Sequence, residues 1–292
     1  MKKITRITAV AMIATLMTFN GLMVSANPLV AHQPIGGIPV MPPNIDVTPM
    51  TLSEITKLTP IEVGEHFLNG DYTIIRFSPQ EIFAYQQMMH SLGLDRDVGL
   101  VVAVTLVIPG NLSNAEIEAE TFHHLARIGD LATIETYFGN IIDLDSFTSH
   151  PFTTTNRLEI SNPQRQPGLF HLHPRIGIAA TGSPNVTMYI SQTSSLSNSF
   201  TTTAGVTAAA VSAAVGFSVT QSRSMTVQGS WTSPAGSRGG MFEAFGLFNR
   251  YTFDVWSITR NSAGAIVGND WVDRGNAHRS TGGVYFVGTA WW

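Results

Sequence analysis

An alternation of period two in the last third of the chain is the feature that most constrains the fold. From residue 184 to 292, β-branched or aromatic residues alternate with small polar ones, and glycines separate the runs. Met188 and Ile190 share one face of an extended chain, as do Val284 and Phe286. Because successive side chains of a strand point to opposite faces, this pattern predicts half-buried strands. We therefore expect residues 184–292 to form an antiparallel, β-sandwich-like domain or a curled sheet.

Residues 51–150 follow a different pattern, which predicts a small domain of mixed helices and strands. Four capping boxes indicate helix starts, since a hydroxyl can cap free N–H groups while a glutamate reaches back. These boxes begin at Thr51, Thr59, Ser78 and Ser113. Two apolar runs, 72–77 and 98–108, predict strands, and the second favours burial on both faces. The expected fold class is therefore α+β. Residues 151–183 are expected to connect two domains and could add one or two strands, such as one at 157–160.

The first 26 residues have the pattern of a secretion signal. Basic residues open the chain, an apolar stretch follows at 7–19, and Val24 and Ala26 supply the small residues of a cleavage site. Cleavage is expected after Ala26, and the apolar stretch is too short to cross a bilayer as a helix. A Pro-rich leader at 27–50 follows, which should bury little surface. We expect an exported, extracellular protein.

Composition excludes some partners and some sources of stability. The net charge is −4, and residues 184–292 carry no lysine. Nucleic-acid binding needs a denser positive surface than this, so no nucleic-acid partner is expected. The chain contains no cysteine, so the protein is free of disulfides and must be stabilised by its hydrophobic core.

Three runs in the C-terminal part of the chain carry a family resemblance. They are residues 213–220, with a glycine between apolar residues, 251–256, and 282–287, which opens on two glycines. This series resembles a C-terminal β-rich module found in uncharacterised secreted proteins of Gram-positive bacteria. The resemblance implies export and a β fold, and it implies no activity and no site residues.

Two groups of residues have spacings that metal sites use. His171 and His173 would place two imidazoles on one face of a strand, as some zinc sites do. A second group falls within two turns of a predicted helix and comprises Glu116, Glu120, His123 and His124. Neither group has further ligands at a recognisable spacing, so we expect no metal and no cofactor. Known nucleophile and phosphate-loop motifs are also missing, and a hydrolase built around the two strand histidines is the least favoured function.

Aromatic and arginine side chains of the β region are candidates for ligand binding. The candidates are Trp231, Arg250, Tyr251, Trp256 and Trp271. They could form a platform for a polymer or a protein, although a sandwich core also needs large aromatic residues. The favoured function is a non-enzymatic binding protein that acts outside the cell or at its surface. Its partner would be an extracellular polymer or protein.

One long segment supports an alternative function. Residues 187–226 include 17 Ser or Thr in 40 residues, and Arg223 is the only charged residue among them. The segment is similar to the Ser/Thr-rich amphipathic hairpin that aerolysin-type pore-forming proteins insert into membranes, with a polar face toward water and an apolar face toward lipid. Its small-residue part, 206–215, would be either a short helix ended by Gly216 or a strand. The competing interpretation is an ordinary pair of Ser/Thr-rich sandwich strands.

Overall fold

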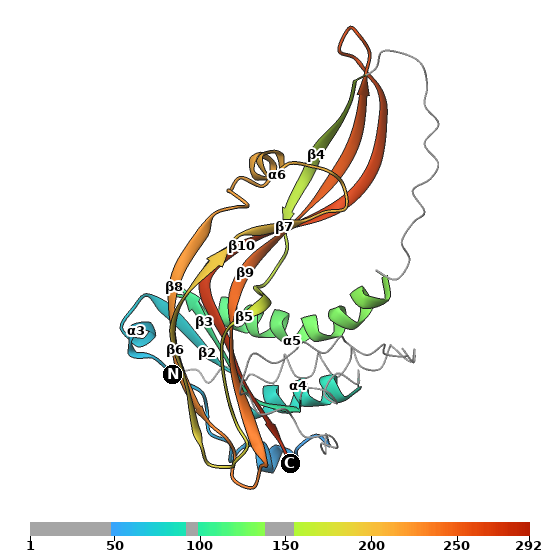
Figure 1. Cartoon of the computed structure of the whole chain (residues 1–292). Helices are drawn as coiled ribbons and strands as arrows, with labels where there is room; N and C mark the ends of the chain where they lie inside the picture. The colour runs from blue at the N-terminus through green and yellow to red at the C-terminus, as the bar shows by residue number, and fades with distance from the viewer. Residues whose placement is uncertain (1–47, 92–98, 138–154) are drawn as a thin grey trace.

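The computed structural model describes residues 48–91, 99–137 and 155–292 (Figure 1). The predicted signal lies outside these residues, as does nearly all of the predicted leader. The helices are α2 (Leu52–Ile55), α3 (Glu65–Leu68), α4 (Pro79–Ser91), α5 (Asn114–Tyr137) and α6 (Ala208–Val215). The strands are β1 (Glu62–Val63), β2 (Tyr72–Arg76), β3 (Leu100–Pro109), β4 (Thr155–Arg165), β5 (Phe170–Thr181), β6 (Thr187–Ser197), β7 (Ser199–Thr201), β8 (Ser222–Thr232), β9 (Gly239–Arg260) and β10 (Ile266–Trp291). Antiparallel strands dominate beside a few helices, which confirms the α+β class.

A long hairpin of β9 and β10 forms the frame of the molecule. The two strands pair from Gly239 and Trp291 at one end to Arg260 and Ile266 at the other. The free edge of β9 pairs first with β5 and then with β4, while that of β10 pairs with β3 and β7. The seven-stranded sheet is therefore broad at one end, here called the body. It narrows to an arm made of β4 and the adjoining halves of β9 and β10 (Figure 1).

The body has three layers. A second, three-stranded sheet in the order β1-β8-β6 covers one face of the large sheet, and helices α4 and α5 lie against the other (Figure 1). Successive side chains of the β9–β10 frame point to opposite faces of the large sheet. Phe286 packs toward the small sheet and Tyr285 packs toward the helices. Strand β3 is buried along nearly its whole length because both of its faces are covered. The burial expected for residues 98–108 is confirmed for 99–108, the part of this run that the structure describes.

The two segments that were predicted to be separate domains contribute strands to one sheet. Strands β2 and β3, from residues 51–150, pair with β10, which belongs to residues 184–292. Two strands alone make a marginal sheet, so β3 gains its second partner from the C-terminal part of the chain. Residues 151–183, expected to be a connector with room for one or two strands, contribute β4 and β5, and both pair with β9.

Three of the four capping boxes form as predicted. The backbone N–H groups of Thr51, Ser78 and Ser113 donate to the glutamate three residues later at 2.8, 2.6 and 2.8 Å. The box at Thr59 does not form, because Glu62 begins β1 and pairs with β8. A long-range strand contact therefore overrides the local helix signal there.

Trp231 makes one of the tightest contacts between the two sheets. Its indole lies over Gly240 and Gly288, which belong to β9 and β10. A Cβ on Gly288 would lie 2.7 Å from Trp231 Cδ2, and a Cβ on Gly240 would lie 2.9 Å from Cζ3. Glycine at these positions thus lets the small sheet approach the frame closely.

We predict that Gly288→Val lowers the free energy of unfolding by about 1–3 kcal/mol, because the added side chain overfills the space that Trp231 occupies. Urea denaturation followed by tryptophan fluorescence measures this change. Gly182→Ala is the control, since a Cβ at Gly182 meets no atom within 4 Å. Equal unfolding midpoints for the wild type and Gly288→Val would contradict this account of the sheet contact.

Candidate functional site

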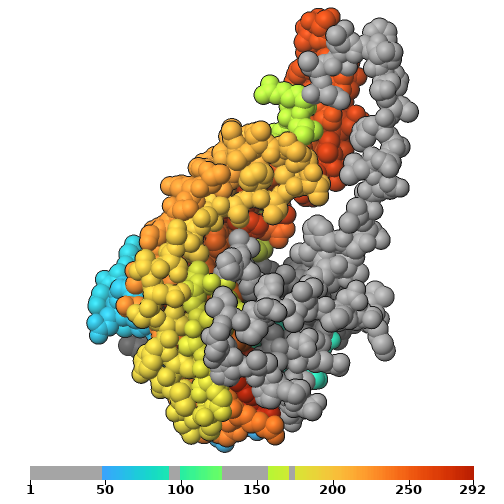
Figure 2. All heavy atoms as spheres, in the orientation of Figure 1, coloured from blue at the N-terminus to red at the C-terminus, as the bar shows by residue number. Residues whose placement is uncertain are grey.

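Strands β6 and β8 form a hairpin that stands apart from the rest of the molecule in composition. Each strand has 11 residues, and the pairing runs without a shift from Thr187 and Thr232 to Ser197 and Ser222. Figure 2 shows the segment from β6 to β8, in yellow to orange, as a strip along one side of the molecule from the body to the arm. We call residues 187–232 the hairpin segment.

The outer face of the hairpin is lined with hydroxyl groups. Paired hydroxyls lie close across the strands: Thr187 and Thr232 at 2.9 Å, Thr193 and Thr226 at 3.3 Å, Ser197 and Ser222 at 2.8 Å. The other outward positions are Tyr189, Ser191, Ser195, Ser224, Gln228 and Ser230. This face is polar and uncharged. It is exposed to water along β6 and the first half of β8, whereas Gln228, Ser230 and Thr232 are partly covered.

The inner face of the hairpin is largely apolar and packs on the large sheet. Its buried side chains are Met188, Ile190, Leu196, Met225, Val227 and Trp231. Gln192 and Ser194 interrupt this row in the middle of β6, and both are uncharged. Arg223, at the start of β8, donates through Nη1 to the Thr281 carbonyl oxygen at 3.2 Å. The hairpin is therefore amphipathic, and its one charge lies near a strand end.

The connection between the two strands crosses onto the arm. It contains β7 and then α6, whose start is capped by Thr207 Oγ1, 3.2 Å from the Ala210 N–H. The helix ends at Gly216, whose φ of 76° lies in the left-handed region that glycine adopts readily. Of the two alternatives left open for residues 206–215, the structure has the short helix that ends at Gly216. Val211 is fully buried, in a small core that it shares with the arm residues Phe253 and Ala277.

Asp273 of β10 fastens this connection to the arm. Its Oδ2 accepts hydrogen bonds from Thr202 Oγ1 and the Thr203 N–H, both at 2.6 Å, and from the Ala204 N–H at 3.3 Å. Burial of the Asp273 carboxyl favours its neutral form. Hydrogen bonds from these residues and from the Arg274 N–H outweigh that effect and hold its pKa below the ordinary value.

Few backbone contacts join the hairpin to its surroundings. Among the described residues, β7 provides the only ladder between the hairpin segment and the large sheet, with three residue pairs to β10. The outer edge of β8 pairs with Glu62 and Val63 of β1, and His66 Nε2 lies 3.0 Å from the Thr226 carbonyl oxygen. Side-chain packing therefore holds most of the hairpin in place.

Three of the predicted ligand-binding residues are occupied by contacts within the protein. Trp231 is buried at 2% exposure in the core between the sheets, where it cannot face a ligand. The Tyr251 ring packs against Phe217 with centroids 5.1 Å apart, on the side of the arm that carries α6. Arg250 is half-buried, and its Nε donates to Asn276 Oδ1 at 2.8 Å.

Two of the predicted residues are brought together. Trp256 and Trp271 form a cross-strand pair between β9 and β10 on the arm. Trp271 is 53% exposed and Trp256 is partly exposed. Alternation in the sequence gave no sign of this pairing, because it depends on the register of two strands joined far from the body.

The two groups of candidate metal ligands lie in different parts of the fold. His171 and His173 are alternate residues of β5, and their side chains lie outside the described part of the structure. In the helical group, His124 is buried beside the rings of Phe77 and Tyr285, and Glu120 accepts a hydrogen bond from the Leu169 N–H at 3.1 Å. In the part of the chain that is described, no three His, Asp or Glu side chains form a group that could hold a metal ion.

Comparison with known proteins adds no family. The chain matches no protein-family model and no curated protein sequence. The resemblance to secreted Gram-positive proteins therefore stays a prediction. Within the described ranges, none of the helices has the length and apolar character needed to span a bilayer.

We predict that Asp273→Asn loosens the connection between β6 and β8, because a neutral amide accepts weaker hydrogen bonds than a carboxylate. Hydrogen–deuterium exchange at pH 7 should then be faster at Thr203 and Ala204 than in the wild type. Asp270→Asn is the matched control, since Asp270 is an exposed neighbour on the same strand. Unchanged exchange in Asp273→Asn would show that the carboxylate does not fasten the segment.

The same contact predicts a dependence on pH. The lowered pKa of Asp273 means that its carboxylate stabilises the fold at neutral pH, and that this contribution is lost as the pH falls through the folded-state pKa. We expect the wild type to approach the exchange behaviour of Asp273→Asn only below the usual aspartate range, about pH 3.9. Convergence of the two proteins already at pH 6 would contradict this assignment.

Proposed function

We propose that the protein is an exported, membrane-active protein that inserts its hairpin segment into a bilayer as part of a β-lined pore. The observation that carries the proposal is the division of the hairpin into a hydroxyl-lined face and an apolar face, on two paired strands of 11 residues. A strand needs about 9–11 residues to cross a bilayer. Strands that line a pore alternate between apolar and polar side chains in this way.

The way the hairpin is held supports its release. Its two strands bond to each other along their whole length, so it can leave the large sheet with these hydrogen bonds intact. Leaving exchanges the apolar contacts around Ile190 and Val227 for contacts with lipid, and it breaks few backbone pairs. Arg223 lies near a strand end, where a charge costs less in a membrane than at the midplane.

Insertion requires several copies of the chain. In lipid, the outer backbone edges of one hairpin would lack hydrogen-bond partners, which costs several kcal/mol for each group. Pairing with the hairpins of neighbouring copies supplies those partners. The proposal therefore includes an oligomer that forms at the membrane.

The binding function favoured by the sequence takes second place. A plain pair of sandwich strands needs an apolar inner face, but it needs neither an uncharged outer face nor strands of spanning length. Recognition of a surface polymer is compatible with membrane insertion, and it is argued separately below from the arm.

We predict that wild-type protein releases dye from liposomes, and that a disulfide between the hairpin and the large sheet blocks this release. Gly177→Cys with Ile190→Cys supplies the disulfide, since a Cβ on Gly177 would lie 2.5 Å from Ile190 Cγ2. The chain contains no other cysteine to interfere. Reduction should restore release in the same sample, because the hairpin is then free to leave.

A disulfide within the hairpin provides the matched control. Thr193→Cys with Thr226→Cys joins β6 to β8 at residues that already pair, and it leaves the hairpin free to move as a unit. This variant should release dye when oxidised. The proposal fails if the wild type releases nothing from neutral and anionic vesicles at neutral and acidic pH. Undiminished release by the oxidised Gly177→Cys/Ile190→Cys variant would also contradict it.

A further inference from the structure

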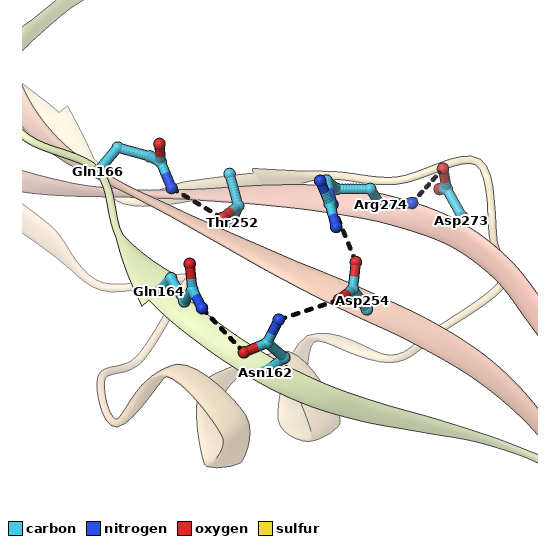
Figure 3. A network of polar contacts seen from close by, with 7 residues as sticks. All are labelled: Asn162, Gln164, Gln166, Thr252, Asp254, Asp273 and Arg274. Atoms are coloured by element: carbon cyan, nitrogen blue, oxygen red, sulfur yellow. Dashed lines mark hydrogen bonds and ion pairs between the residues drawn. The ribbon is translucent and has the colours of Figure 1, made fainter.

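A polar hollow of about 270 Å³ lies on the arm, on the face of the sheet opposite α6. Thr252 and Asp254 of β9 point into it, whereas Phe253 between them belongs to the core under α6. Figure 3 shows the polar side chains that converge there from three strands. They are Asn162 and Gln164 of β4, Gln166 just after it, Thr252 and Asp254 of β9, and Arg274 of β10.

An irregularity in β4 builds the hollow. The register between β4 and β9 shifts between Ser161 and Gln164, and Asn162 there has a φ of 54°. Asparagine tolerates this left-handed conformation better than most residues, and bulges of this kind redirect side chains. As a result, Asn162 Nδ2 reaches Asp254 Oδ2 at 3.2 Å.

Asp254 is the fixed centre of the site. It is 7% exposed, and its Oδ1 accepts a hydrogen bond from Arg274 Nε at 2.9 Å. This bond is the main cause that lowers the pKa of Asp254, and bonds from Asn162 and Trp271 add to it despite partial burial. The carboxylate therefore stays charged and oriented at neutral pH, while the Arg274 side chain remains 65% exposed.

The amide groups around this centre retain capacity for a ligand. Gln164 Nε2 donates to Asn162 Oδ1 at 3.0 Å, and Gln166 Nε2 donates to Thr252 Oγ1 at 2.9 Å. Each contact uses one N–H of an amide that also has a second N–H and a carbonyl oxygen. The hollow thus presents both donors and acceptors in fixed positions.

An aromatic surface borders the hollow on the same face of the sheet. Trp256 lies two residues after Asp254 on β9, and its cross-strand neighbour Trp271 hydrogen-bonds to the same carboxylate. An exposed indole offers a flat apolar face beside these polar groups. A ligand that extends from the hollow past Asp254 to Trp271 would meet a ring beside oriented hydrogen-bonding groups.

We propose that this hollow binds a neutral sugar residue of an extracellular glycan. A pyranose ring has an apolar C–H face for Trp271 and hydroxyl groups that both donate and accept hydrogen bonds. Asp254 and Arg274 offset each other's charge, so the site favours a neutral ligand over an ionic one. The volume lies just below the range of about 300–1,000 Å³ for small-molecule sites, which suits one ring of a longer chain. This proposal does not rest on membrane insertion.

The test begins with the full-length protein on an array of printed neutral and sialylated oligosaccharides. Isothermal titration calorimetry with a retained neutral oligosaccharide then compares the variants. Trp271→Ala and Gln164→Ala should each weaken binding about tenfold, which corresponds to the loss of one stacking or hydrogen-bond contact. Tyr189→Ala is the matched control, because Tyr189 is a 71% exposed aromatic residue on β6, away from the arm. It should bind as the wild type does.

Retention of no neutral glycan on the array would overturn the proposal. Unchanged affinity in both arm variants would also overturn it, as would equal losses in Tyr189→Ala. Circular dichroism and thermal unfolding confirm that each variant folds. Dye release from glycan-free vesicles separates this site from the pore: the arm variants should release dye normally, and the oxidised Gly177→Cys/Ile190→Cys variant should bind glycan normally.

Discussion

The continuous antiparallel pairing of β9 with β10 is the constraint on which the rest of the structure depends. Each strand passes through both the body and the arm, so the same ladder supports the three-layered core and the narrow polar sheet. Every other strand of the large sheet except β2 takes its place by pairing with one of these two edges. Where the body meets the arm, the register of this ladder shifts between Ser280 and Gly283, and the pairing resumes on both sides of the shift.

The β6–β8 hairpin is attached in a different way. It lies on the frame through side chains such as Ile190 and Trp231. Its two strands bond to each other along one edge, and the outer edge of β8 carries only the short pairing with β1. Close approach at Gly240 and Gly288 strengthens this packing without adding a ladder. A frame joined by backbone bonds and a hairpin joined mainly by side chains have different costs of separation, and this difference makes a controlled release physically reasonable.

Local and periodic signals in the sequence predicted much of this fold. Capping boxes such as the one at Ser78 depend on residues three apart, and alternation in residues 187–226 revealed the two faces of the hairpin. Pairing between distant segments was not predictable from one sequence: β1 forms beside β8, where a helix start was expected at Thr59. The arm hollow was missed for the same reason, since its contact between Asn162 and Asp254 spans 92 residues and depends on a bulge.

Site-specific labelling of the hairpin in the presence of liposomes would test the central claim most directly. The chain has no cysteine, so single cysteines at successive positions of β6, from residue 188 to 196, can carry an environment-sensitive fluorophore. If the hairpin inserts, a quencher attached to the lipid chains should reduce the emission with a period of two, at 188, 190 and 196 but not at 191, 193 and 195, because only lipid-facing positions meet the quencher. Uniform quenching, or none with liposomes that bind the protein, would contradict the account.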